Sequence, residues 1–352
     1  MTKAIIKING ENYDGWKSVS IKRSIETISS AFSFEFTDSW TSSREPWGIN
    51  PQDACDIVSG STRLIRGYID VLNANLGGER SYTVQGRDKS ADLVDCSASI
   101  KQYKSISLLD LCNALASPVG VSFTLQSPLT NNARFPSFAI DPGETIFSAI
   151  DRAVRMRGVL CIPDGSGNVV LSLAGVIPAA VQLIEGENCK TASYTLDYSK
   201  RFSSYDVKGQ DTGADGFFGS ATTVSGRSTD EGVKRNRPMI IHADNRCDSS
   251  EAKTRASWEA NVRAARSTRA EVFVQGWEQI RGLPWQINQI VQLKAPRLGL
   301  SGRFLISDTD MSQDSQGGET CKLTLVPPDA FLSDPKVKKK KSDQVAKGFT
   351  FP

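Results

Sequence analysis

The motif Pro46-Trp47-Gly48-Ile49-Asn50 occurs a second time as Pro284-Trp285-Gln286-Ile287-Asn288, 238 residues further along the chain. An alternating apolar segment and a tryptophan precede each copy, and a glycine-containing apolar strand and a Gly-Gly-Glu triplet follow it. These flanking features are Phe34-Glu35-Phe36, Trp40 and Gly77-Gly78-Glu79 in the first copy, and Val272-Phe273-Val274, Trp277 and Gly317-Gly318-Glu319 in the second, with the triplets 240 residues apart. Four features in one order at nearly one offset indicate an internal duplication.

The duplication predicts two related antiparallel β-barrels in this chain of 352 residues. The alternative is that Pro-Trp and Gly-Gly are common turn and core signals of any all-β protein. In the first interpretation, Trp47 and Trp285 occupy equivalent places, and we expect both, with Trp40 and Trp277, to serve core packing or an interface. Three such chains in a ring would place six similar barrels around one axis, which would match a six-fold partner.

The first barrel is expected to span residues 1–88. Phe32, Phe34 and Phe36 alternate with polar residues, and turn signals such as Asn9-Gly10 separate the alternating segments. A period of two that buries one face is typical of an antiparallel sheet packed over a core. The pattern therefore predicts a mainly β chain.

A mixed α+β module is expected at residues 89–187. Ser107-Leu108-Leu109-Asp110 has the form of a capping box, and the apolar segment after it ends before Pro118. A second helix follows Glu144 and ends before Gly158, with apolar residues at helical spacing. A hairpin with its turn at 163–168 closes the module.

The remainder of the chain is expected to contain the second copy and its connections. Residues 188–249 hold connecting strands, in which Tyr194 and Leu196 alternate with polar residues, and a long Gly/Ser/Thr-rich loop at 209–232. The second barrel, at 250–331, begins with a helix over about 251–266. Residues 332–352 are expected to form a flexible basic tail.

The charge of the chain is concentrated in that tail. The chain has 42 Lys+Arg and 39 Asp+Glu, but residues 336–352 contain six lysines and one acid, which leaves 36 bases against 38 acids elsewhere. A nucleic-acid-binding domain normally shows a basic face instead. The lysine run at 336–341 is interpreted as a solvated tail, as an arm that docks on an acidic partner or, least favoured, as a nucleic-acid-binding segment.

Cysteine usage and hydropathy bear on location. The seven cysteines are scattered singly, without a C-x-x-C pair, which is typical of reduced thiols and not of a disulfide frame or zinc site. No apolar run approaches the roughly 20 residues of a transmembrane helix, and residues 1–7 lack the apolar region of a signal peptide. We therefore expect no stable membrane insertion and a protein that stays where it is made.

Signals of enzyme chemistry are weak. His242 is the single histidine, and with Asp244 and Cys247 it superficially offers a base, an orienting group and a thiol, but the set is local in sequence. Asp92 and Asp95 could serve a glycosidase as paired carboxylates. No phosphate-binding, nucleophile-elbow or dinucleotide motif is present. We expect no catalytic, metal or cofactor site.

Three segments resemble the baseplate hub proteins of Mu-like contractile-tailed phages. They are residues 86–97, beginning Gly86-Arg87-Asp88, residues 16–25, beginning Trp16-Lys17-Ser18, and Val274-Gln275-Gly276-Trp277 together with Trp258-Glu259. The resemblance covers residues 5 to about 331. One departure is Pro51-Gln52-Asp53, where the resemblance implies a glycine between the proline and the aspartate.

The resemblance implies a structural protein of the virion tail baseplate, assembled in the cytoplasm of the bacterial host. It implies a homotrimer whose two barrels per chain form a pseudo-six-fold ring, joining a trimeric central spike to the tail tube and other baseplate proteins. DNA would pass through the bore without specific binding, for which a bore depleted of bases is expected. The alternatives are a tail-associated peptidoglycan-degrading glycosidase and a carbohydrate-binding β-protein that uses its tryptophans as stacking platforms.

Overall fold

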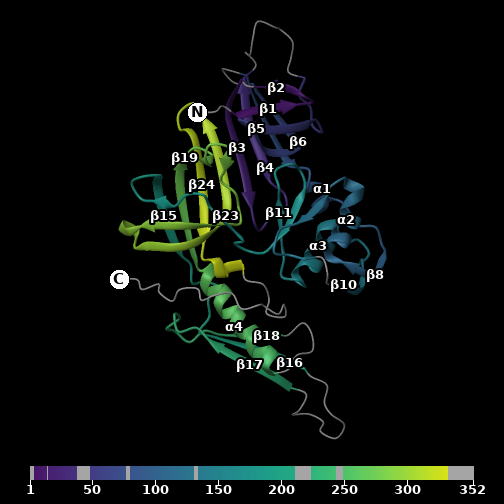
Figure 1. The fold of residues 1–352 in the computed structure, drawn as a ribbon, viewed down its shortest axis with the longest axis vertical. Helices are drawn as coiled ribbons and strands as arrows, with labels where there is room; N and C mark the ends of the chain where they lie inside the picture. Colours follow the sequence, from purple (N-terminus) through teal and green to yellow (C-terminus); the bar gives the residue numbers. More distant parts are fainter. Residues whose placement is uncertain are drawn as a thin grey trace.

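The structure is a computed structural model, which describes residues 4–13, 15–37, 48–76, 80–130, 134–210, 223–242 and 249–331. A central sheet dominates it, with a mixed module on one flank and a smaller sheet with one long helix at the opposite end from β1 and β2 (Figure 1). The fourteen strands of the central sheet are β1 (Ala4–Ile8), β2 (Glu11–Tyr13), β3 (Trp16–Ser24), β4 (Ala31–Thr37), β5 (Ala54–Ser59), β6 (Thr62–Leu76), β7 (Arg80–Asp88), β13 (Ile177–Pro178), β14 (Leu183–Ile184), β15 (Cys189–Leu196), β19 (Thr268–Gln275), β22 (Gln289–Ala295), β23 (Leu300–Asp314) and β24 (Gly318–Val326).

The central sheet contains the same strand arrangement twice. The first sheet unit has the order β3-β4-β7-β6-β5, and the second sheet unit has the order β15-β19-β24-β23-β22. In each unit the longest strand, β6 or β23, has 15 residues and pairs with the strand that follows it. The duplication seen in the sequence is therefore also a duplication of strand order.

Irregularities in the strand pairing recur at equivalent places. Lys17 bulges out of the β3–β4 pairing, and Lys190 bulges out of the β15–β19 pairing. Asp70 is skipped in the β6–β7 register, and Ser307 is skipped in the β23–β24 register. A bulge adds one residue to one strand and fixes the local register, so these matches align the two units residue by residue.

The two units form one sheet because β3 pairs with β23 of the other unit. The expectation of two separate closed barrels is thus wrong for the described residues, in which the strand order of the central sheet runs as an open path. The physical reason is that the edge of β3 that would have to close on its own unit is used by β23.

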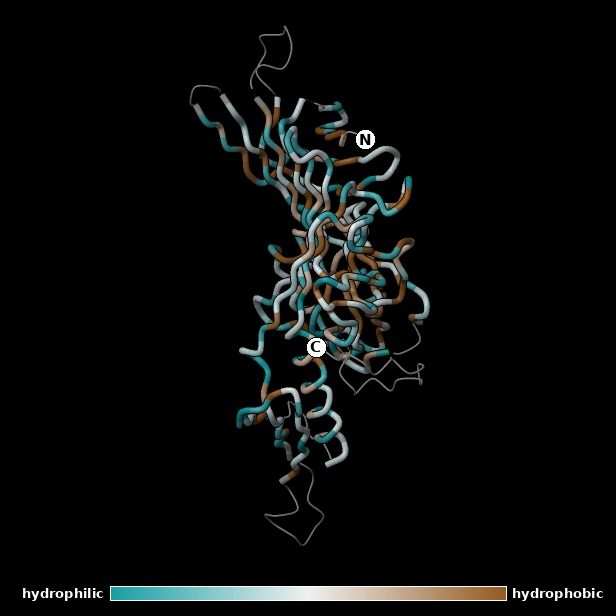
Figure 2. The backbone as a smooth tube through the Cα atoms, turned by 90° about the vertical axis from the view of Figure 1, so that its left-hand side faces the viewer, coloured by the Kyte–Doolittle hydropathy of each residue, from teal (hydrophilic) through white to brown (hydrophobic). Residues whose placement is uncertain are grey.

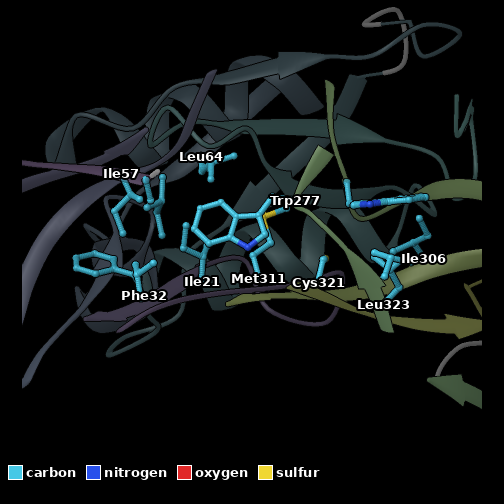
Figure 3. Close-up of a cluster of buried hydrophobic side chains, with 14 of the residues drawn as sticks. Ile21, Phe32, Ile57, Leu64, Trp277, Ile306, Met311, Cys321 and Leu323 are labelled. Carbon is cyan, nitrogen blue, oxygen red and sulfur yellow. The ribbon is translucent and has the colours of Figure 1, made fainter. Parts of the chain in front are cut away.

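One hydrophobic core serves both units. It includes Ile21, Phe34 and Ile57 from the first unit and Val272 and Leu323 from the second, each less than 4% exposed. Figure 3 shows the Trp277 indole between labelled side chains of both units. Because the units share buried surface, we expect them to fold together.

The mixed module confirms the predicted helices. Its elements are α1 (Ala91–Asp95), β8 (Gln102–Ser107), α2 (Leu108–Ala116), η1 (Ser117–Val119), β9 (Phe123–Leu125), β10 (Arg134–Ala139), α3 (Ile146–Arg155), β11 (Leu160–Pro163) and β12 (Val169–Ser172). The Ser107 hydroxyl accepts a hydrogen bond from the Asp110 N–H at 3.2 Å, as the capping box requires. Thr145 caps α3 in the same way, and β11 and β12 form the predicted hairpin.

The small sheet consists of β16 (Ser204–Gln210), β17 (Thr223–Thr229) and β18 (Pro238–His242), covered by α4 (Ser249–Arg266). The predicted helix over 251–266 is confirmed, and seen from the side this sheet and helix project from one end of the molecule (Figure 2). The expected loop over 209–232 is wrong at 209–210, which end β16, and at 223–229, which form β17. Gly226 explains this, since a Cβ there would lie 2.1 Å from the backbone nitrogen of Lys253 on α4.

The remaining short elements are β20 (Glu278–Ile280), β21 (Leu283–Pro284), η2 (Pro296–Leu298) and η3 (Pro328–Phe331). In the turn before β5, Gln52 has φ 78°, a left-handed conformation that favours glycine, where the family resemblance implies one. No helix among the described residues combines the length and apolarity needed to cross a membrane.

Candidate assembly interface

The pairing of β3 with β23 is called here the filled joint. It runs antiparallel from Ser24 opposite Asp308 to Ser18 opposite Asp314. Ile21 and Met311 lie opposite each other at its centre, and both are fully buried. This contact removes the edges of both strands from water, which is how a sheet avoids unwanted pairing.

The polar side of the filled joint is held by an ion pair and a hydrogen bond. The Lys22 Nζ lies 3.8 Å from Asp310 Oδ2, and the Ser20 hydroxyl donates to Asp310 Oδ1 at 3.3 Å. The Lys22 side chain is 68% exposed, so the solvent weakens the attraction. The apolar pair beneath, not the ion pair, therefore carries most of the energy of this joint.

The strands equivalent to those of the filled joint have unpaired edges within the described residues. Residues 191–196 of β15 pair only with β19, and residues 71–75 of β6 pair only with β7. We call the free side of β15 and the free side of residues 71–75 the open edges. Tyr194 and Leu196 on β15 are 40% and 41% exposed. Apolar side chains on an unpaired edge are typical of a surface that another strand covers.

One face of the central sheet is mainly polar on β7, β4, β3, β23 and β24, with the exposed Val71 of β6 and Phe273 of β19 at its two sides. Its middle row consists of small neutral side chains that lie opposite one another on five strands: Gln85, Ser33, Ser20, Ser312 and Thr320. The rows on either side are Arg87, Ala31, Lys22, Asp310 and Lys322, and Thr83, Glu35, Ser18, Asp314 and Gly318. These rows contain three bases and three acids, and no base lies in the middle row, so no basic stripe runs along the strands.

The bases of this face have acidic neighbours. Arg87 contacts Asp95 at 2.7 Å and Asp70 at 2.9 Å, and these hydrogen bonds raise the pKa of Arg87 above its usual value. Asp310 lies between Lys22 and Lys322 in the register. Beside this row, a hollow of about 520 Å³ opens on the first unit. Because the charges compensate one another locally, the face offers little net attraction to a phosphate backbone.

The tryptophans that the sequence singled out are described in part. Trp277 is fully buried, and its Nε1 donates to the carbonyl oxygens of Ser312 and Thr320, each at 3.0 Å. Trp285 is 2% exposed, and its backbone N–H donates to the Trp277 carbonyl at 2.9 Å. Trp40 and Trp47 lie outside the described residues, as do Lys336–Lys341. The two described tryptophans therefore pack in the core of their own chain.

The candidates for enzyme chemistry are described only in part. His242 is an exposed residue at the end of β18, and Asp244 and Cys247 lie outside the described residues. A hydrogen bond from Arg87 holds the pKa of Asp95 below its usual range, whereas a glycosidase acid needs a raised pKa. In the part of the chain that the structure describes, no three metal-ligating side chains come together.

Sequence reasoning missed the open edges. The alternation of Tyr194 and Leu196 indicated a strand with one apolar face, but it did not show that this strand would lie at the edge of the sheet. The edge becomes visible only when β15 is compared with its duplicate β3, which has a neighbouring strand on each side in the sheet.

Known proteins similar to this chain include the baseplate hub protein gp44 of Escherichia phage Mu. That protein is 34% identical over 337 residues, which cover 93% of this chain and 88% of the relative. The chain belongs to the Mu-like phage baseplate hub proteins. The family resemblance of the sequence is thus confirmed.

Family models match this hub protein in three places. They are the N-terminal domain of Mu phage baseplate assembly protein GpP-like proteins at residues 3–88, the second domain of baseplate hub protein gp44-like proteins at 90–173, and the fourth domain of GpP at 248–334. The first and third matches cover the two regions that contain the repeated motif.

Two solved structures resemble the hub protein along nearly its whole length. The 43 kDa tail protein of prophage MuSo2 from Shewanella oneidensis has a TM-score of 0.81 at 30% identity, over 94% of this chain and 99% of that one. The tail protein from Neisseria meningitidis MC58 has a TM-score of 0.77 at 20% identity, over 93% and 98%. The first supports the family and the second the fold.

Proposed function

We propose that this hub protein forms a homotrimeric ring that joins a trimeric central spike to the six-fold tail tube. The observation that carries this proposal is the duplicated sheet unit, because three chains contain six such units. A chain with two equivalent units can meet a three-fold partner through whole chains and a six-fold partner through units. The protein would then act as a symmetry adaptor in the virion tail baseplate, assembled in the host cytoplasm.

The polar face of the central sheet is the proposed wall of the bore. The opposite face packs against the shared core, to which β1 and β5 also contribute buried side chains. If the units join edge to edge into a ring, the bulky side suits the outside and the bare polar face suits the lumen. The balanced charges of its three central rows would let DNA pass without the counterion release that makes binding tight.

The proposed role is structural, without a cofactor or stable membrane insertion. In support, the Asp95 carboxylate is engaged by Arg87, and the lowered pKa of Asp95 does not suit the general acid of a glycosidase. Purified protein should release no reducing ends from peptidoglycan. Turnover there would favour the glycosidase instead.

Electron microscopy of the purified protein tests the ring. Averaged views along the axis should show three-fold symmetry, six lobes of similar size and a central opening. Views with two lobes per particle, or three lobes only, would contradict the proposal that both sheet units lie around one bore. Addition of double-stranded DNA should leave the particles unchanged.

A further inference from the structure

We propose that neighbouring chains join by antiparallel pairing of the open edges, β15 of one chain with residues 71–75 of β6 in the next. In this pairing Leu72 lies opposite Leu196, and Ala74 lies opposite Tyr194. The inference rests on the proposed ring, and it names the two edges and the register that close it. It follows from treating the filled joint as a template for its missing equivalent.

The alignment of the two units supplies the template. The bulged residues Asp70 and Ser307 are 237 positions apart, and the adjacent pairings agree: Ile69 opposite Gly86 corresponds to Ile306 opposite Leu325. The bulged residues Lys17 and Lys190 are 173 positions apart. Subtracting 237 from a residue number in β23 thus gives the equivalent residue of β6. Adding 173 to a residue number in β3 gives the equivalent residue of β15.

These two offsets convert the filled joint into a predicted contact between chains. The filled joint places Asp308, Thr309, Asp310, Met311 and Ser312 opposite Ser24, Arg23, Lys22, Ile21 and Ser20. The converted pairs are Val71 with Asp197, Leu72 with Leu196, Asn73 with Thr195, Ala74 with Tyr194, and Asn75 with Ser193. No pair combines two like charges. The two offsets alone determine the register.

The chemistry of the converted pairs agrees with the faces of the sheet. Leu72 packs against the shared core, and Tyr194 lies opposite the buried Ala270, so the apolar pairs fall on the core side. The pairs of Asn73 with Thr195 and Asn75 with Ser193 fall on the polar side. A slip of one residue in either direction would place Tyr194 opposite an asparagine, Asn73 or Asn75, and break this match. The match was not used to derive the register, and it excludes slips by an odd number of residues.

The open edges also lack the features that protect a permanently exposed edge. Residues 71–75, Val-Leu-Asn-Ala-Asn, contain no proline and no charge. On β15 the only charged residue is Lys190 at the bulge, while Leu196 and Tyr194 stay about 40% exposed. Unpaired edges without such protection invite strand addition. A second copy of this chain supplies the matching edge.

Cysteine cross-linking tests the register. The matched variant is Asn73→Cys with Thr195→Cys, in a full-length background with Cys96→Ser, Cys189→Ala and Cys247→Ser. A second matched pair, Leu72→Cys with Leu196→Cys, reads the same register from the other face of the sheet and serves if the first variant folds poorly. The control is Asn73→Cys with Thr191→Cys, which uses the same face but is shifted by four residues. Within one chain six strands separate β6 from β15, so these disulfides can form only between chains.

Mild oxidation should convert at least one matched variant into a covalent trimer on a non-reducing gel, with at least ten-fold less product from the shifted control. Equal cross-linking of the control would overturn the register. A trimer by light scattering that gives no cross-link in either matched pair would overturn the edge pairing while leaving the ring intact. A monomer by light scattering, with cysteines reduced, would overturn both the pairing and the ring.

Discussion

The filled joint and the open edges use equivalent strands, but only the filled joint is complete within one chain. At the filled joint Ile21 is fully buried, whereas Tyr194, its equivalent on β15, is 40% exposed. The strand arrangement around the two residues is the same, so the difference in burial comes from the missing neighbour. The comparison teaches that one half of a repeated contact stabilises the fold and the other half is available for assembly.

The largest effect is expected from a substitution that disrupts the filled joint. Ile21→Ala removes a fully buried side chain from the shared core and should lower the free energy of unfolding by about 2–5 kcal/mol. Urea unfolding of a chain kept monomeric by Leu196→Asp measures it. The matched control is Tyr194→Ala at the equivalent position, which should change the unfolding free energy by less than about 0.5 kcal/mol. Equal losses from the two variants would contradict the distinction between the joints.

The next effect concerns the open edges. Tyr194→Ala in the otherwise unchanged chain should weaken the trimer by about 1–2 kcal/mol per joint, because the side chain would lose its buried position against the next chain. Sedimentation over a concentration series measures the dissociation. Ile240→Asp is the control, since Ile240 is 62% exposed on the small sheet, outside the open edges. If Tyr194→Ala left the trimer unchanged and Ile240→Asp dissociated it, the interface would lie outside the open edges.

A third prediction concerns the polar row that crosses the filled joint. Ser20→Lys, Ser33→Lys and Ser312→Lys together place three bases on neighbouring strands of a neutral row. The variant should bind duplex DNA at least ten-fold more tightly than the unchanged protein, a difference of about 1.4 kcal/mol that disappears at high salt. Filter binding over a salt series measures the affinity for DNA.

The control for this prediction adds the same three charges to exposed positions of α4, as Ser249→Lys, Ser250→Lys and Thr254→Lys. This variant should show only the general effect of added charge, because α4 lies away from the polar face. Equal tightening of DNA binding by the two variants would contradict the assignment of the neutral row to the bore.

A smaller effect tests the ion pair across the filled joint. Lys22→Ala should cost about 0.2–1 kcal/mol of unfolding free energy, because Lys22 is mostly exposed and salt screens the attraction to Asp310. The difference should vanish at high salt. A loss as large as that of Ile21→Ala would show that charge, not apolar contact, holds this joint.

The smallest expected effect concerns an ion-pair cluster that distinguishes the first unit from the second. Arg87 and Asp70 of the first unit form ion pairs, together with Asp95 of α1, that the second unit does not repeat, since Ser307 stands where Asp70 would be. The pKa of Asp95 is lowered in the fold, so its stabilising contribution is present above the unfolded pKa and is lost as pH falls through the folded pKa. As pH falls below about 4, unchanged protein should lose stability more steeply than Asp95→Asn in urea unfolding. Parallel curves would contradict this.

Local signals in the sequence predicted local structure well. The Ser107 capping box, the apolar spacing of α3 and the position of α4 all correspond to observed helices. The repeated Pro-Trp motif led to the duplication, because turn and core residues recur wherever the same strands recur. In these cases the controlling interactions lie within a few residues of one another.

Contacts between distant segments could not be predicted in the same way. The pairing of β3 with β23 joins residues almost 300 positions apart, and no local pattern encodes it. The strand β17 was hidden by its polar Gly/Ser/Thr composition, since Gly226 is required there by the approach of α4. The triplets at 77–79 and 317–319 suggested an offset of 240, whereas Val84 and Leu323, which occupy equivalent places, are 239 apart. Register depends on bulges and turns that sequence similarity alone does not locate.

The most direct test of the account is the solution mass of the purified protein, measured by light scattering over a dilution series with residues 336–352 present and deleted. We expect three times the mass of one chain in both forms, and the mass of one chain for Leu196→Asp. A monomer at every concentration, or a trimer that Leu196→Asp leaves intact, would contradict the claim that open edges of the duplicated sheet build the ring.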